Sequence, residues 1–273
     1  MSDDLVLVTT KNRVRTLTMN NPRRLNGWTL PMQRALGAAL DAAARDDDVA
    51  AVVLTGTGTY YSAGADLSGA FKLGHPRTLR ALVVKGNHEL FDQFIRFPKP
   101  LLAAINGVAL GAPVTTAVLC DAIVASEAAS FSTPFARLGV PAEGCSSVLF
   151  PRLFGAAVAD RILGEEGWKP TAREALEIGL VEAVVPADAL LDEAQRIAEG
   201  WVAAGRARTY RGGATRAELE MVNARESEEV ADAFLSKKFL MNQYRFLKSK
   251  KKTGPAMTFL ALAVTRPLWG RLL

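Results

Sequence analysis

The sequence of 273 residues is poor in the residues that build metal centres and disulfide frameworks. It has two cysteines, Cys120 and Cys145, and two histidines, His75 and His88. No cysteine spacing matches a metal site or a disulfide scaffold, so we expect a reducing compartment, with Cys120 buried in its apolar run. Both histidines lie far from the cysteines, which favours structural or surface roles and predicts no bound metal.

Long apolar segments are also missing. No apolar stretch reaches the ~20 residues that span a bilayer, and the acidic start at residues 1–4 lacks the features of a signal peptide. The last three residues, Arg271, Leu272 and Leu273, do not match the Ser-Lys-Leu peroxisomal address. We therefore expect an intracellular protein, peroxisomal or cytoplasmic, without a clear targeting signal.

Charge of one sign is only moderately in excess. Lys and Arg number 33 against 28 Asp and Glu, and much of the net charge of +5 lies in the run 248–252. Because no nucleic-acid-binding motif accompanies this charge, we predict no nucleic-acid partner; a moderate positive balance suits anionic small molecules. Hydrophobic residues make up 49% of the chain, which is enough to fill a substantial core.

Apolar runs of strand length alternate with helical patterns in the first part of the chain. Strands are predicted at 5–8 and 14–19, which form a hairpin around the polar turn at Lys11 and Asn12, and at 49–55, 101–105, 122–125 and 130–133. Helices are predicted at 31–44, 78–97, 111–119 and 143–153. This alternation indicates an α/β fold with parallel strand pairing, but it does not give the strand order.

Beyond residue 156 the pattern is mostly helical. Helices are predicted at 171–178, 189–204 and 218–252, the last with a break near Ser227, and a strand at 181–185. We divide the chain into a core of residues 1–200 and a C-terminal region of residues 201–273, which is helical and ends in an apolar tail. That tail, from residue 254 onward, docks on its own domain, on a neighbouring subunit or on a membrane surface; the sequence leaves the three open.

Two turns of small residues each join a predicted strand to a predicted helix. The first turn contains Ala63, Gly64, Ala65 and Asp66, and the second contains Gly111 and Ala112. Small side chains let a ligand approach the main chain, and a helix start presents unpaired N–H groups. Two such turns that converge would form an oxyanion hole, but turns of this kind are common in α/β proteins. We expect Asp66 to cap its helix.

The chain resembles the crotonase superfamily, the enoyl-CoA hydratases and isomerases. The matching segments, in the family's order and spacing, are Asn21–Asn26, Val52–Gly56, Tyr61–Leu67, Pro98–Pro100, Ala104–Gly111 and Cys120–Asp121. The resemblance implies a crotonase-like spiral of ββα units with a helical C-terminal region, assembled as a homotrimer or hexamer. It also implies an acyl-CoA thioester as substrate, so that coenzyme A belongs to the substrate and no separate cofactor is expected.

The resemblance assigns roles to particular residues. The thioester oxygen is expected between the main-chain N–H groups of Ala65 and Ala112, and Arg24 and Leu25 match the region that holds coenzyme A. Asp121 is expected to be structural. The lysines Lys72, Lys237 and Lys238 either meet the phosphates of coenzyme A or form a solvated surface.

The candidate acid–base residue differs from that of the hydratases. Where hydratases of this family carry two glutamates, the chain has Thr115 and Phe135, which are expected to line the acyl pocket. Glu143, within a segment similar to the peroxisomal-type Δ3,Δ2-enoyl-CoA isomerases, falls at the position of their base. The resemblance therefore implies an isomerase of fatty-acid β-oxidation. Read from the residues alone, Glu143 also suits a carboxylate that stabilises the start of the helix after it.

Two other functions stay open from the sequence. The same fold serves an enoyl-CoA hydratase or another acyl-CoA lyase of secondary metabolism. A crotonase-like scaffold without catalysis, acting as a binding module, is the third interpretation.

Overall fold

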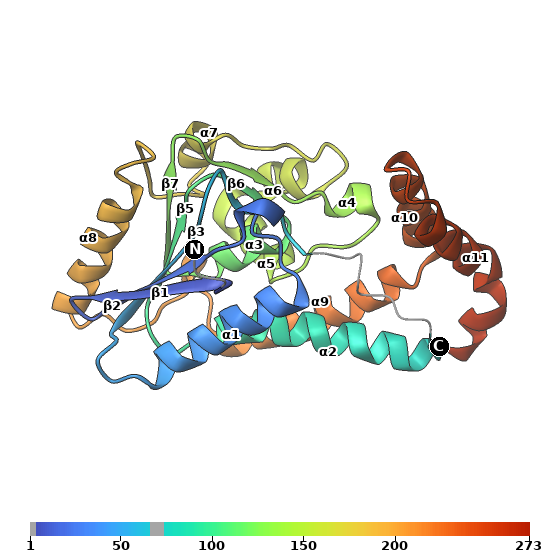
Figure 1. Ribbon diagram of the computed structural model, residues 1–273, viewed down its shortest axis with the longest axis horizontal. Helices are drawn as coiled ribbons and strands as arrows, with labels where there is room; N and C mark the ends of the chain where they lie inside the picture. Colours follow the sequence, from blue (N-terminus) through green and yellow to red (C-terminus); the bar gives the residue numbers. More distant parts are fainter. Residues whose placement is uncertain (1–3, 66–73) are drawn as a thin grey trace.

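The computed structural model describes residues 4–65 and 74–273. Its main sheet has the strand order β1-β2-β3-β5-β7-β9, in which β1 and β2 are antiparallel and all later neighbours are parallel (Figure 1). The strands are β1 (Val6–Lys11), β2 (Val14–Met19), β3 (Ala51–Gly56), β5 (Leu101–Ile105), β7 (Ala122–Ser126) and β9 (Ala183–Val185). The predicted hairpin and the α/β class with parallel pairing are confirmed, and the strand order is now known.

The continuous apolar strands are explained by helices on both faces of the main sheet. Val52 and Leu54 of β3 pack into the larger core, whereas Ala51 and Val53 face the other way and pack with α8 (Leu190–Ala203). Neighbouring residues of a strand point to opposite faces, so a strand covered on both sides is apolar throughout. Figure 1 shows α8 apart from the other helices, alone on its face of the sheet.

The larger core lies between the sheet and the remaining helices of the first part of the chain. These helices are α1 (Leu30–Arg45), α2 (Pro76–Ile95), α3 (Ala112–Val118), α5 (Ser146–Phe154), α6 (Ala156–Leu163) and α7 (Ala172–Glu177). The short helix α4 (Phe135–Leu138) contributes no residue to this core. Trp28, Phe94 and Cys120 are among its fully buried side chains, which confirms the predicted burial of the Cys120 thiol.

A second, smaller sheet carries the turns of interest. Its parallel strands β4 (Tyr60–Ser62), β6 (Val108–Leu110) and β8 (Ser130–Ser132) lie in that order. Only β8 was predicted, because the other two strands are too short to show an alternating pattern. The carboxyl ends of parallel strands share one edge of a sheet, so the segments after these three strands lie close together.

Three helices form the C-terminal part: α9 (Arg216–Phe234), α10 (Lys237–Ser249) and α11 (Thr253–Trp269). Helix α9 lies along α2 (Figure 1). The break predicted near Ser227 is wrong, because α9 runs through it and ends before Leu235. The hydroxyl of Ser227 lies 2.7 Å from the carbonyl oxygen of Asn223, one turn back, so this serine is satisfied inside the helix. Ser236 instead caps α10 by accepting from Phe239 N–H.

The apolar tail docks on its own chain, which is one of the three possibilities that the sequence left open. Helix α11 packs along α10 and buries Ala256 and Ala263. The guanidinium of Arg266 donates to the carbonyl oxygen of Leu235 at 2.6 Å, which ties α11 to the end of α9.

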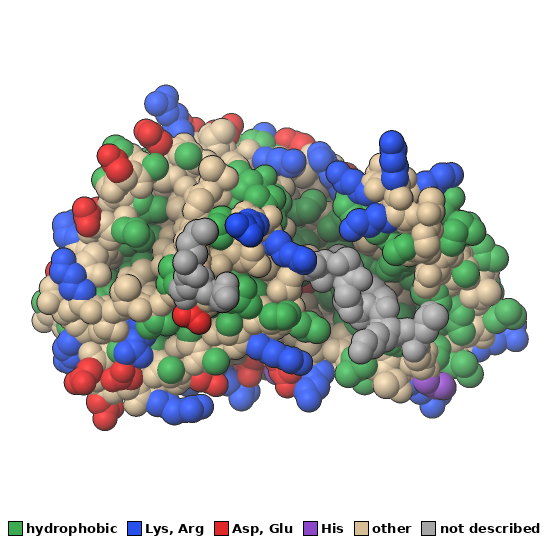
Figure 2. Space-filling view, viewed as in Figure 1, with side chains coloured by type: hydrophobic (Ala, Val, Ile, Leu, Met, Phe, Trp, Pro, Cys, Tyr) green, Lys and Arg blue, Asp and Glu red, His purple; other side chains and the backbone are tan. Residues whose placement is uncertain are grey.

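The outer face of α11 stays exposed and apolar. Met257, Val264 and Leu268 are exposed by 57, 66 and 73%. Nine of the 33 basic residues and none of the acidic ones follow residue 236, and Figure 2 shows basic side chains gathered near the end of the α10–α11 hairpin. Contact of this face with a membrane or another subunit stays a prediction. Among the described residues, no helix is long and apolar enough to cross a bilayer.

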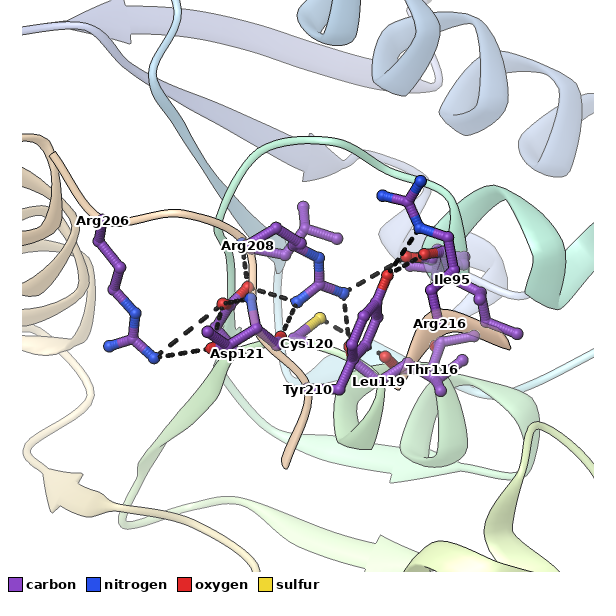
Figure 3. A network of polar contacts seen from close by, with 12 residues as sticks. Ile95, Thr116, Leu119, Cys120, Asp121, Arg206, Arg208, Tyr210 and Arg216 are labelled. Atoms are coloured by element: carbon purple, nitrogen blue, oxygen red, sulfur yellow. Dashed lines mark hydrogen bonds and ion pairs between the residues drawn. The ribbon is translucent and has the colours of Figure 1, made fainter. Parts of the chain in front are cut away.

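A buried ion pair fixes the loop between α8 and α9. The carboxylate of Asp121, with no exposed side-chain area, accepts from Leu101 N–H at 2.8 Å, from Thr209 N–H at 2.7 Å and from the guanidinium of Arg208 (Figure 3). Arg208 also donates to the carbonyl oxygen of Leu119 at 2.6 Å. The structural role predicted for Asp121 is confirmed.

Candidate functional site

The two small-residue turns lie side by side at the ends of neighbouring strands. Ser62 of β4 pairs with Ala109 of β6, so the turns after these strands start at the same edge. Gly64 has a φ of +85°, and a Cβ atom on it would lie 2.7 Å from the carbonyl oxygen of Leu110. Only glycine fits that approach without moving the main chain. The two turns therefore lie in close contact, a proximity that the residues alone left open.

Each turn ends at an alanine whose amide was singled out from the sequence. Ala112 is the first residue of α3, where the N–H group has no helical carbonyl four residues earlier. Gly111 before it has a φ of +66°, and its own N–H donates to the carbonyl oxygen of Ser132 at 2.7 Å, which anchors the turn to β8. Ala112 is buried, whereas Ala65 is exposed.

The residues matched to coenzyme A binding lie beside the first turn. The N–H of Ala63 donates to the carbonyl oxygen of Leu25 at 2.9 Å. Leu25 is 41% exposed and Arg24 is also exposed, so both side chains are accessible next to the turn. Asp66 and Lys72 lie outside the described residues.

The loop that carries Glu143 packs directly on α3. Gly144 has a φ of +67°, and a Cβ atom on it would lie 2.6 Å from the hydroxyl oxygen of Thr115 and 2.5 Å from the ring of Phe91. Thr115 is buried in α3, one turn after Ala112. This contact therefore places Glu143 next to the helix that follows the second turn. Phe135, which follows the third strand β8, is buried at the start of α4.

The carboxylate of Glu143 is held by a side chain of α2. Asn87 Nδ2 donates to Glu143 Oε2 at 2.7 Å. The hydroxyl of Ser227, on α9, lies 3.0 Å from Asn87 Oδ1 and donates to it, although its single hydrogen serves either Asn87 or the carbonyl of Asn223 at one time. Because the amide oxygen faces a hydroxyl, the amide nitrogen faces Glu143.

Burial raises the pKa of Glu143 to about 7, well above the usual value of a glutamate. The hydrogen bond from Asn87 opposes this by favouring the charged form, and the nearby carboxylate of Glu226 adds to the rise in pKa. A carboxyl group with a pKa near neutrality is suited to accept and return a proton at physiological pH.

Glu226 is a second buried carboxylate next to the loop. It accepts from Cys145 N–H at 2.6 Å, from Ser147 N–H at 3.0 Å and from the Ser147 hydroxyl. Burial raises the pKa of Glu226 to about 7 against the effect of these hydrogen bonds. The interpretation of Glu143 as the carboxylate that stabilises the next helix is wrong, because Glu226 binds the amides at the start of α5, whereas Glu143 bonds to Asn87.

Asn87, Glu226 and Ser227 lie at the site but were not predicted as site residues from the sequence. The signal for the last two is their position in α9, whose buried residues follow helical spacing and include three polar side chains. The buried residues of α9 are Leu219, Val222, Asn223, Glu226, Ser227, Val230 and Ala231. A buried polar group needs a hydrogen-bonding partner, so polar residues on such a face indicate a network. Asn87 on α2 carries no comparable signal.

Comparisons with known proteins show the family to which the chain belongs. Residues 9–251 match the family model described as enoyl-CoA hydratase/isomerase. The chain belongs to this family. It is 42% identical over 185 residues to enoyl-CoA delta isomerase 2 of Rattus norvegicus, which covers 66% of this chain and 46% of the rat protein. It is 35% identical over 194 residues to 2,3-dehydroadipyl-CoA hydratase of Escherichia coli (strain K12), covering 71% of this chain and 74% of that protein.

The fold is shared with solved members of the family. The crystal structure of an enoyl-CoA hydratase/isomerase from Pseudoalteromonas atlantica T6c matches with a TM-score of 0.75 at 28% identity, covering 90% of this chain and 97% of that one. The predicted crotonase fold is therefore confirmed. The matched region spans about half the length of the rat isomerase, and the relatives include both an isomerase and a hydratase. Family membership alone does not choose between the two reactions.

Proposed function

We propose that this protein is a Δ3,Δ2-enoyl-CoA isomerase in which Glu143 is the one acid–base residue. The observation that carries the proposal is the carboxylate of Glu143, bound to Asn87, on a loop that packs against α3 beside the turn ending in Ala112. Thr115 and Phe135 bring no carboxylate to the positions at which the hydratases hold their glutamates. The arrangement thus suits a reaction that needs one base and no activated water.

The two turns supply the electrostatic part of the mechanism. The N–H groups of Ala65 and Ala112 donate to the thioester oxygen of the substrate. Charge gathers on this oxygen when the proton leaves C2, so the hydrogen bonds stabilise the enolate more than the ground state. One such donor lowers the barrier by about 3–4 kcal/mol.

Glu143 carries the proton. Its carboxylate accepts the proton from C2 of a 3-enoyl thioester, and the electrons of the broken C–H bond form the dienolate. The dienolate then collapses, the C2–C3 double bond forms, and the carboxyl group returns the proton to C4. No water, metal or redox step enters this balance, and the enzyme ends in its starting protonation state.

The surrounding residues complete the proposed site. Thr115 and Phe135, both buried, border the acyl pocket, and the exposed pair Arg24 and Leu25 contacts coenzyme A. The small turn residues Ala63, Gly64 and Gly111 let the thioester reach the main chain. A homotrimer or hexamer and a place in β-oxidation stay predictions.

The experiment compares the wild type with Glu143→Gln on 3-hexenoyl-CoA, following formation of the 2-enoyl product. We expect the wild type to isomerise this substrate and the variant to lose roughly 10²–10⁴-fold in kcat, the usual contribution of a general base. Glu177→Gln, the same change at an exposed position of α7, is the matched control and should keep wild-type activity.

The other two functions give different results in the same assay. A hydratase forms 3-hydroxyacyl-CoA from 2-hexenoyl-CoA, and a binding module turns over neither substrate even at high protein concentration. Either result, or full isomerase activity in Glu143→Gln, would contradict the proposal.

A further inference from the structure

The main chain after Glu143 has an unfavourable conformation. Gly144 and Cys145 both lie in the left-handed region, with φ of +67° and +63°. Glycine adopts this region freely, but in a cysteine the Cβ atom comes too close to the following carbonyl oxygen, so the conformation is disfavoured. Such a turn persists only where the surrounding structure holds it, and the residue directly before it is the proposed base.

The groups that hold this turn come from α9. Glu226 is fully buried, and its two carboxylate oxygens accept from the N–H groups of Cys145 and Ser147, at 2.6 and 3.0 Å, and from the Ser147 hydroxyl. Both ends of the turn are thereby bound by one side chain. No role in the proton transfer proposed above is assigned to this carboxylate.

The same helix holds the base from its other side. Ser227, the residue after Glu226, bonds to Asn87, whose amide binds the carboxylate of Glu143. Asn223, one turn earlier, donates to the carbonyl oxygen of His88 at 3.0 Å and so fixes α9 against α2 at the level of Asn87. The main chain and the side chain of the base region are therefore both held from one turn of α9.

We infer that Glu226 is a positioning residue for the isomerase reaction, which fixes the turn at residues 144–147 and thereby places the carboxylate of Glu143. The inference rests on the proposed function for its kinetic consequence, and on geometry alone for its structural one. Glu226 does not contact the reacting atoms.

Glu226 also acts on Glu143 through its charge. Its negative charge raises the pKa of Glu143, as a like charge does. Two other charged or titratable groups lie around Glu226. Arg225, on the same helix, lowers the pKa of Glu226. Burial raises the pKa of the Cys145 thiol in the loop, so this thiol is neutral. Loss of the charge at position 226 therefore moves ionisation of Glu143 to lower pH, which a merely structural role would not do.

The test uses Glu226→Gln in the full chain. The amide keeps one acceptor oxygen but turns an NH2 group toward main-chain N–H groups that need an acceptor. We expect kcat on 3-hexenoyl-CoA to fall roughly 10–100-fold with little change in KM, since small displacements of a catalytic group have effects of this size. The acid limb of the kcat/KM profile should move to lower pH. Glu229→Gln, three residues along and exposed, is the matched control and should change neither quantity.

A second variant covers the case in which Glu226→Gln does not fold. Ser147→Ala removes the hydroxyl that donates to Glu226 and so destabilises the charged form of Glu226. With less negative charge at position 226, the acid limb should again move to lower pH, by less than in Glu226→Gln. An unchanged pH profile and kcat in the folded Glu226→Gln, or an unchanged profile in Ser147→Ala where the former does not fold, would overturn the inference.

Failure of the proposed function gives a different pattern. In that case the wild type itself does not isomerise 3-hexenoyl-CoA, and a crystal structure decides the positioning claim instead. The main chain at Gly144 and Cys145 should leave its left-handed conformation in Glu226→Gln and keep it in Glu229→Gln. An undisturbed turn would overturn the inference whatever the protein catalyses.

Discussion

Replacing Asn87 with alanine removes the direct hydrogen bond to the proposed base. The bond, 2.7 Å from Nδ2 to Glu143 Oε2, favours the charged carboxylate and holds the pKa of Glu143 below the value that burial alone would give. In Asn87→Ala the pKa of Glu143 therefore rises. The first step needs the ionised carboxylate, so the acid limb of kcat/KM moves to higher pH.

The size of the effect follows from the strength of such a bond. A hydrogen bond to a charged group is worth about 1.5–3 kcal/mol, and 1.36 kcal/mol corresponds to one pH unit, so the limb should move up by roughly one to two pH units. With a pKa of about 7 in the wild type, half of Glu143 is ionised at pH 7. The variant would retain about 1–10% ionised, which predicts a loss of roughly 5–50-fold in kcat/KM at pH 7 and recovery at higher pH.

The assay is the pH dependence of kcat/KM for 3-hexenoyl-CoA between pH 5.5 and 9.5. Ser227→Ala leaves Asn87 in place but removes the hydroxyl that orients its amide, so its limb should move in the same direction by less. Asn12→Ala at an exposed position is the control. A limb that stays in place in Asn87→Ala, or that moves to lower pH, would refute the assignment of Glu143 as the titrating base.

Two further substitutions test the packing that positions the site. Gly144→Ala should destabilise the fold by more than about 1 kcal/mol and lower kcat roughly tenfold or more, because the new Cβ atom meets Phe91 and Thr115 at a residue with positive φ. Gly86→Ala is the control: the new Cβ atom points into open space on helix α2, so the change should stabilise the fold by about 0.5–1 kcal/mol. Asp121→Asn leaves the buried charge of its arginine partner uncompensated and should cost about 3–5 kcal/mol in urea unfolding, whereas an unchanged stability would contradict the role given to this pair. Asp41→Asn, in an exposed pair, should have little effect.

The strands of the main sheet could be predicted because burial on both faces makes them continuous apolar runs. Strands β3, β5 and β7 are buried almost throughout, and each was located from its hydrophobicity. The three-residue strands β4 and β6 gave no such signal. Their pairing depends on the register between segments almost fifty residues apart, such as Tyr60 with Val108, and a single sequence does not encode this register in any local pattern.

The site was predicted in its parts and not in its assembly. The two turns were visible as small-residue segments, and Glu143 was located through the resemblance to the isomerases. Their proximity follows from two contacts that no spacing reveals, Gly64 against Leu110 and Gly144 against Thr115. In both contacts a glycine allows its own main chain to approach a neighbouring segment, at a carbonyl oxygen in the first contact and at a side chain in the second. The need for glycine becomes apparent only once the neighbouring segment is known.

The break wrongly predicted in α9 shows that polar residues inside a helical pattern carry structural information. A break was predicted near Ser227, and no role was predicted for Asn223 and Glu226, two polar residues that precede it. In the structure all three lie on the buried face, and their partners are the α2 main chain, the amides at the start of α5 and Asn87. Burying three polar groups is unfavourable unless each finds a partner, so such a cluster inside a helix marks a place where the helix fixes another segment. Here the fixed segments are the two that determine where Glu143 lies, which makes α9 part of the site although it carries none of the reacting groups.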